Sequence, residues 1–287
     1  MFITGNGFEN LGQMETRNGG SLTILASTWR NAGRIDGAGT GTLTFDGAWT
    51  NAGLVSLAGG TWKLGGTFGL ASLGSYERTA GSMVVSGNLN LAGATLALGA
   101  DTGSWSLEGG TIRNGTIVQT GEHRLRVSNF SGNTLDAVSM EGDLMLDVPT
   151  AFLRIRNGLT LAGTAQVNNG AVLEFDGSQT WGTGSLRFAG TGGFLRFNGQ
   201  LTLGPSLLVH GGSGEIQAQL AAARLINLGT IATDVEGGRM FVTAARVDNQ
   251  GTLRASAANS VLTVRSANFT QSGTIEELNG GDVRINP

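Results

Sequence analysis

A seven-residue motif that returns about every 21 residues constrains the fold of this chain more than any other feature. It consists of a bulky apolar residue, any residue, Asn or Gln, any residue, Gly, any residue and a second apolar residue. Its polar and glycine positions are Asn10 and Gly12, Asn31 and Gly33, Asn51 and Gly53, Asn227 and Gly229, Asn249 and Gly251, and Gln271 and Gly273. Repeats of this length indicate a solenoid in which each repeat forms one coil.

Short alternating segments between the motifs predict β-strands. Residues 42–45 and 261–264 alternate in the way that buries one face of a strand, and turn pairs such as Asn157-Gly158 follow such segments. These pairs also favour antiparallel hairpins, but the same residue types return in the same order, which favours parallel stacking. The sequence therefore predicts an all-β fold, a single-stranded right-handed parallel β-helix (β-solenoid) with about 20–22 residues per coil. A left-handed winding is the alternative.

The repeats predict one continuous β-solenoid over residues 1–287. They are regular in 1–67 and 221–287, whereas the coils of 68–220 are more divergent. About thirteen or fourteen coils at ~4.8 Å per strand would make a rod about 60–65 Å long. Within the Ala-rich segment 217–224 we expect a short helical turn.

The motif residues have expected structural roles. The aromatic residues that open the first repeats, Phe8, Trp29, Trp49 and Phe68, are expected to stack in the core. The Asn would bond backbone groups at a bend, and the Gly would supply a conformation that other residues resist. On this interpretation, replacing Asn31 with Leu or Gly33 with Val loosens a coil.

Charge and composition narrow the function classes. With 18 basic and 21 acidic residues the net charge is −3, which argues against nucleic acid as a partner. The absence of Cys is compatible with an exported protein. We expect no transmembrane helix, because no apolar run approaches ~18 residues. Residues 1–12 lack the features of a signal peptide, so any export signal is expected outside this chain.

Charged side chains supply the only candidates for chemistry. Residues two apart on a strand share a face. The candidate carboxylates are Glu141, Asp143 and Asp147, Glu174 with Asp176, and Asp234 with Glu236. The simpler interpretation, which we favour, is that outward strand positions tolerate charge. We expect no catalytic residue, metal ligand or cofactor, since His123 and His210 have no Cys to join them.

Four arginines form the one candidate binding patch. Arg124 and Arg126, and likewise Arg154 and Arg156, would share a face, and Asp143 and Asp147 lie between the two pairs in sequence. Such a patch could contact an acidic glycan, or form a surface ladder of opposite charges.

The motif as it stands in 49–55, in Leu228-Gly229-Thr230-Ile231 and in 249–253 resembles the repeats of filamentous haemagglutinin-like adhesins and autotransporter passengers, which are right-handed β-helices. The resemblance covers the two ends well and the centre loosely, and the Asn-Pro-Asn-Gly secretion signature is missing. It implies an extracellular or cell-surface bacterial stalk or adhesin. Its partners would be copies stacked end to end into filaments, neighbouring coils of a longer chain, or surface glycans. The alternative is a carbohydrate-active β-helix enzyme, a polysaccharide lyase or hydrolase.

Overall fold

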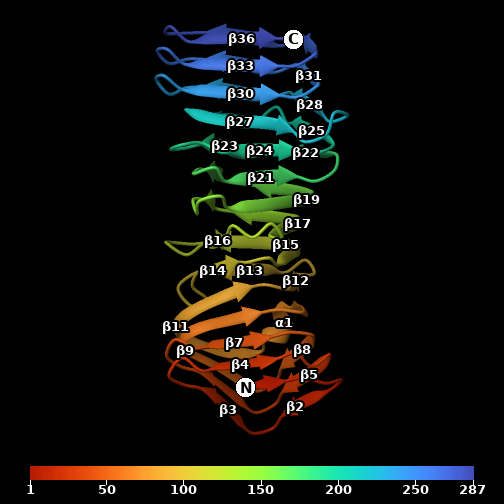
Figure 1. Cartoon of the computed structure of the whole chain (residues 1–287), viewed down its shortest axis with the longest axis vertical. Coiled ribbons are helices and arrows are strands. Elements are labelled where there is room, and N and C mark those ends of the chain that lie inside the picture. The colour runs from red at the N-terminus through yellow and green to blue at the C-terminus, as the bar shows by residue number, and fades with distance from the viewer. The chain divides into compact units, whose positions relative to one another are not determined.

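The computed structural model describes residues 1–287 and contains almost only parallel β-strands. They form a right-handed parallel β-solenoid of about 14 turns with coils of about 21 residues, as the repeats predict (Figure 1). Contacts divide the chain into two compact units, Met1–Arg126 with Gly132–Thr134, and Val127–Ser131 with Leu135–Pro287. Each unit is described by itself.

The first unit contains two parallel sheets and the only helix, α1 (Leu70–Leu73). Its strands are β1 (Phe2–Ile3), β2 (Phe8–Asn10), β3 (Gln13–Thr16), β4 (Ser21–Ile24), β5 (Thr28–Asn31), β6 (Arg34–Gly37), β7 (Thr42–Phe45), β8 (Ala48–Asn51), β9 (Leu54–Leu64), β10 (Thr67–Gly69), β11 (Ser75–Val85), β12 (Asn88–Asn90), β13 (Thr95–Leu98), β14 (Trp105–Leu107) and β15 (Thr111–Gln119). One sheet follows the order β1-β4-β7-β9-β11-β14, with β3 pairing with β6 and β6 with β9, and the other follows β2-β5-β8-β10-β12-β15, with β13 also pairing with β15. Two strands, β16 (Leu125–Val127) and β17 (Thr134–Glu141), are divided between the units.

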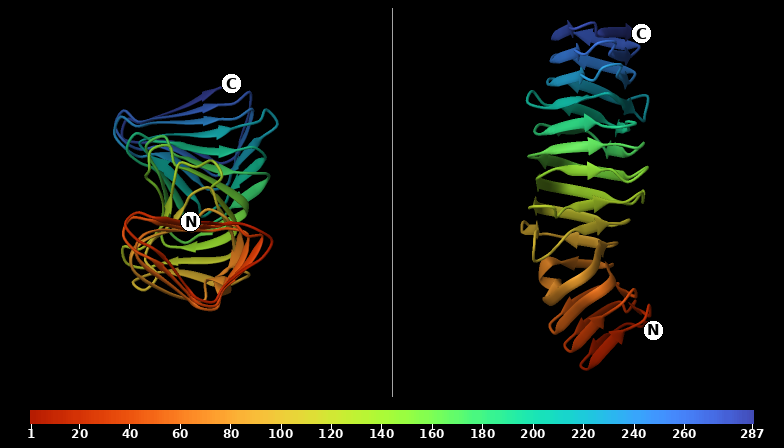
Figure 2. Two further views of the ribbon diagram at one scale, coloured as in Figure 1. Left: turned by 60° about the horizontal axis from the view of Figure 1, so that its bottom comes forward. Right: turned by 90° about the vertical axis from the view of Figure 1, so that its left-hand side faces the viewer.

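In the second unit, three parallel sheets form the three sides of each coil. Its strands are β18 (Leu144–Leu146), β19 (Phe152–Leu161), β20 (Thr164–Val167), β21 (Val172–Phe175), β22 (Gln179–Trp181), β23 (Ser185–Phe188), β24 (Phe194–Phe197), β25 (Gln200–Leu203), β26 (Leu208–Gly211), β27 (Ser213–Ala218), β28 (Arg224–Asn227), β29 (Thr230–Thr233), β30 (Arg239–Thr243), β31 (Arg246–Asn249), β32 (Thr252–Ala255), β33 (Val261–Arg265), β34 (Asn268–Gln271), β35 (Thr274–Glu277) and β36 (Asp282–Asn286). The sheets follow the orders β19-β21-β24-β27-β30-β33-β36, β18-β20-β23-β26-β29-β32-β35 and β22-β25-β28-β31-β34. Figure 2 shows the strands of this unit, green to blue, stacked coil upon coil.

Coil length varies without loss of register. Gln200 of β25 pairs with Arg224, 24 residues later, whereas Arg224 pairs with Arg246 after 22 residues. The longer coil places its extra residues in the turn between β27 and β28. The helical turn expected in 217–224 is therefore wrong. Its first residues continue β27, where Ala218 pairs with Phe197, because strand pairing outweighs the helix propensity of alanine.

The core of the first unit is aromatic. The predicted stack is confirmed: the rings of Phe8 and Trp29 lie 6.5 Å apart, those of Trp29 and Trp49 6.0 Å apart, and those of Trp49 and Phe68 5.0 Å apart. Trp29, Trp49 and Phe68 are buried. In the second unit the equivalent positions of two successive coils hold the buried aliphatic residues Leu225 and Val247, and an aromatic residue returns only at Phe269 in the last coil.

Candidate functional site

The motif asparagines of the first unit form a buried ladder of side-chain amides. The Nδ2 of Asn10 donates to Oδ1 of Asn31 over 2.7 Å, and Asn31 donates to Asn51 over the same distance. Asn51 ends the ladder by donating to the carbonyl oxygens of Leu73 and Ser75, both at 2.8 Å. Each amide thus satisfies the next, so these buried polar groups incur little desolvation cost.

The second unit repeats the same arrangement. Asn227 donates to Oδ1 of Asn249 over 2.7 Å, and Asn249 donates to Oε1 of Gln271 over 2.8 Å. We call the bend formed by a motif Asn and its Gly a corner. At the corners of Asn227 and Asn249 the backbone carbonyl of the Asn also accepts two N–H groups from the following coil, as Asn227 does from Gln250 and Gly251. The corner is therefore hydrogen-bonded through both side chain and backbone, and it fixes how one coil sits on the next.

The motif glycines serve a different purpose from the one expected. None of the six has a positive φ, so an unusual backbone conformation is not their role. A Cβ at Gly33 would overlap the carbonyl oxygen of Gly12, and one at Gly53 would overlap that of Gly33. Gly12 itself has open space at this position. Glycine is required because the backbones of successive corners lie in direct contact, a condition that the repeat spacing alone does not reveal.

The first amide of the second ladder, that of Asn227, lacks a hydrogen bond to its oxygen. The buried Oδ1 of Asn227 has no hydrogen-bond partner, because the residue that pairs with Asn227 in the preceding coil is Leu203. On the other side of Leu203, its strand partner Trp181 has a buried indole Nε1 that is also unpartnered. The coils before and after Leu203 thus each contain a buried polar atom without a partner, the donor Nε1 of Trp181 and the acceptor Oδ1 of Asn227.

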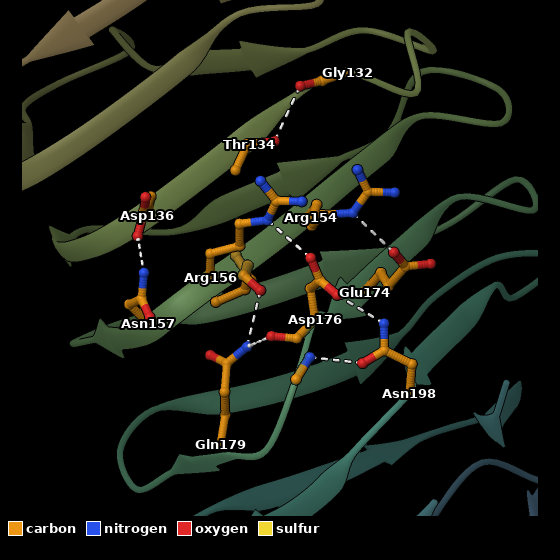
Figure 3. A network of polar contacts seen from close by, with 12 residues as sticks. Gly132, Thr134, Asp136, Arg154, Arg156, Asn157, Glu174, Asp176, Gln179 and Asn198 are labelled. Atoms are coloured by element: carbon orange, nitrogen blue, oxygen red, sulfur yellow. Dashed lines mark hydrogen bonds and ion pairs between the residues drawn. The ribbon is translucent and has the colours of Figure 1, made fainter. Parts of the chain in front are cut away.

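A network of charges occupies the outer face of β19, β21 and β24 (Figure 3). The Nε of Arg154 lies 2.9 Å from Oε1 of Glu174, and that of Arg156 lies 2.8 Å from Oδ2 of Asp176. Asn198 donates to the other oxygen of Asp176 over 2.7 Å. Two of the four arginines of the candidate glycan patch are therefore already paired with carboxylates.

These contacts set the charge state of Asp176. The hydrogen bond from Asn198, followed by that from Arg156, lowers the pKa of this carboxyl below its ordinary value. A general acid for glycoside cleavage needs a raised pKa, because it must hold its proton near neutral pH. The Asp176 carboxylate therefore suits an ion pair better than acid catalysis.

The other two patch arginines belong to the first unit. Arg124 precedes β16 and its Nη2 lies 3.7 Å from Glu122, while Arg126 is exposed on β16. Asp143 accepts the backbone N–H of Thr164 over 2.8 Å. The carboxylates that pair with Arg154 and Arg156 thus come from the next coil, and the sequence order that suggested Asp143 and Asp147 does not reflect this register.

The remaining candidates for chemistry lie apart from one another. Asp234 is hydrogen-bonded to Nδ1 of His210 at 2.7 Å, and Glu236 is exposed in the turn that follows. No group of three or more His, Cys, Asp or Glu side chains is placed to hold a metal ion. No helix has the length and apolar character needed to cross a bilayer.

Sequence reasoning missed a row of arginine–phenylalanine pairs on the sheet that contains β19 and β24. The guanidinium carbon of Arg154 lies 5.3 Å from the ring centroid of Phe152, and that of Arg196 lies 4.6 Å from Phe194. Arg265 lies 4.2 Å from the ring of Phe241 in the neighbouring coil. Phe followed two residues later by Arg, at 152–154 and 194–196, is the signal that could have indicated the first two pairs.

Comparison of the chain with protein-family profiles, with curated proteins and with solved structures found no match. The corner ladders and the outer faces are therefore the basis for a functional proposal.

Proposed function

We propose that this chain is an extracellular structural or adhesive element of a bacterial surface, a stalk or adhesin whose copies stack end to end. The repeat resemblance supports the location and the class of protein. The corner ladders support a stiff scaffold, because they link successive coils through buried hydrogen bonds. Outer strand faces would then contact surface glycans. Many weak contacts along one scaffold would give strong multivalent binding.

The observation that carries the stacking proposal is the exposure of inward-facing apolar residues in the last coil. Ile275 continues the buried column of Leu253, yet it is 40% exposed where Leu253 is fully buried. Gln271 accepts from Asn249, and its own amide donates to no group in the chain. In the first coil, Asn10 offers the same type of amide, and Met14, which occupies the motif position of Ile275, offers an apolar side chain. A second copy, or a further coil of a longer chain, would continue both the core column and the amide ladder, and we propose the second copy.

Negative-stain electron microscopy over a range of protein concentrations tests the proposal. We expect fibres that lengthen with concentration for the unaltered chain, and isolated particles for Ile275→Glu, which places a charge in the contact. Thr274→Glu adds the same charge at the neighbouring exposed position and serves as the control, because it should still form fibres.

Isolated particles of the unaltered chain at every concentration would overturn the stacking proposal. Fibres formed equally well by Ile275→Glu would show that copies associate through another surface.

A further inference from the structure

The phenylalanines of the three arginine–phenylalanine pairs of the second unit recur at a fixed interval along one outer face. Phe152 is aligned through Val172 with Phe194, and Phe194 is aligned through Glu215 with Phe241. Each phenylalanine is therefore two coils from the next, about 9.6 Å at the spacing of parallel strands. This interval is close to the length of two sugar residues in an extended β-linked chain.

A shallow groove of about 330 Å³ follows the last two of these phenylalanines. Phe194 and Phe241 lie along it, and Glu215 and Arg239 supply charged groups. Gly192, Gly193 and Gly214 also line it and expose their backbone to it. A groove with aromatic rings, small residues and charged groups that can bond hydroxyls is suited to a chain of flat, polar rings.

The charge of this groove differs from that of the neighbouring ladder. Arg154 is paired with Glu174, whereas Arg196, Arg239 and Arg265 have no carboxylate within ion-pair distance. Glu215 is the one acidic side chain that lines the groove. Within the lining, Arg239 and Glu215 balance in charge, and the guanidinium groups of Arg196 and Arg265 beside Phe194 and Phe241 add two positive charges at the rim of the groove.

Stacking prepares these arginines for an anionic ligand. A guanidinium group held over an aromatic ring loses less freedom on binding than a mobile one, and its N–H edge still points outward to carboxylates or sulfates. Arg196 also donates from Nε to Gln217 over 3.3 Å, which holds its side chain along the sheet.

We propose that the groove around Phe194 and Phe241 binds an acidic polysaccharide that carries one acidic group per disaccharide and lies along the stacking direction of the coils. Arg196 and Arg265 would bind successive acidic groups, and Arg239 with Glu215 would bond the hydroxyls between them. This inference rests on the proposed surface role and names the class of glycan.

Binding of hyaluronan oligosaccharides, which carry one carboxylate per disaccharide, tests the proposal by isothermal calorimetry at physiological salt. We expect the double variant Arg196→Gln/Arg265→Gln to bind at least about tenfold more weakly, the usual size of a charge-assisted contact. The double variant Arg187→Gln/Arg246→Gln is the matched control, because it removes the same two charges from exposed positions on strands of the other two sheets and should bind as the unaltered chain does. Circular dichroism establishes that each variant is folded.

Two results would overturn the proposal: no binding by the unaltered chain, or equal weakening by Arg187→Gln/Arg246→Gln, which would indicate attraction by overall charge alone. Equal binding of neutral cello-oligosaccharides would overturn the requirement for an acidic group. Because fibre formation is measured separately, a chain that stacks but fails to bind would refute this inference and leave the stacking proposal intact.

Discussion

The regular coils at the two ends of the sequence have the same asparagine–glycine corners but differ in the side chains that fill their cores. Residues 8–55 contain the amide ladder of Asn10, Asn31 and Asn51 around an aromatic core, in which Trp29 and Trp49 stack. Residues 225–275 contain the same ladder around a core that is aliphatic except for Phe269 in the last coil. The comparison teaches that the Asn and Gly of the corner determine how coils stack, whereas the core accepts any combination of apolar side chains of suitable total volume.

The largest expected effect tests the interior of the two regions. Trp49→Ala should destabilise the first unit by about 3–5 kcal/mol, because it empties a stacked position between Trp29 and Phe68. Val247→Ala, at the equivalent position of the other region, should cost about 2 kcal/mol, since it removes less buried surface. Urea denaturation measures both, and equal losses would contradict the proposed difference in core filling.

A second test concerns the shared corner. Gly33→Ala should cost about 1–3 kcal/mol, because the new Cβ overlaps the Gly12 carbonyl oxygen, and Gly251→Ala should cost a similar amount against Gly229. Gly12→Ala is the control, since its Cβ would meet open space. If all three variants melt at the temperature of the unaltered chain, close backbone contact is not what requires glycine.

The third test extends the ladder into a coil that lacks it. Leu203→Asn places an amide between the orphan acceptor on Asn227 and the orphan donor on Trp181. We expect it to be about 1–2 kcal/mol more stable than Leu201→Asn, which buries the same amide on the same strand without such partners. Chemical denaturation of the two variants gives this difference directly, and a less stable Leu203→Asn would show that the two orphans are out of reach.

The smallest effect belongs to the outer face. Because the pKa of Asp176 is lowered in the folded chain, its ion pair stabilises the fold above the ordinary pKa of about 3.9. That contribution is lost as the pH falls through the lowered value, and it should stay below about 1 kcal/mol because the pair is partly exposed. Asp176→Asn should therefore lose less stability than the unaltered chain between pH 5 and pH 2 in urea denaturation, and an equal loss would contradict a stabilising role of this ion pair.

The sequence predicted the parallel solenoid, its coil length and its aromatic stack, because period and residue order report directly on which residues lie above one another. It did not predict that Gly33 is required by contact with Gly12, since a glycine at a bend is usually explained by its backbone angles. The partners of Arg154 and Arg156 also escaped prediction. They depend on the register of one coil on the next in the divergent middle section, where the motif that defines the register has faded.

The turn between β27 and β28 lengthens its coil while the flanking strands keep their partners. Leu220 at its tip is 58% exposed. A foreign peptide inserted at this tip would project outward without shifting any strand, so the molecule can gain or exchange surface epitopes one loop at a time. Variation at such turns and constancy at the asparagine corners would let a lineage change what its surface presents while the scaffold beneath stays the same.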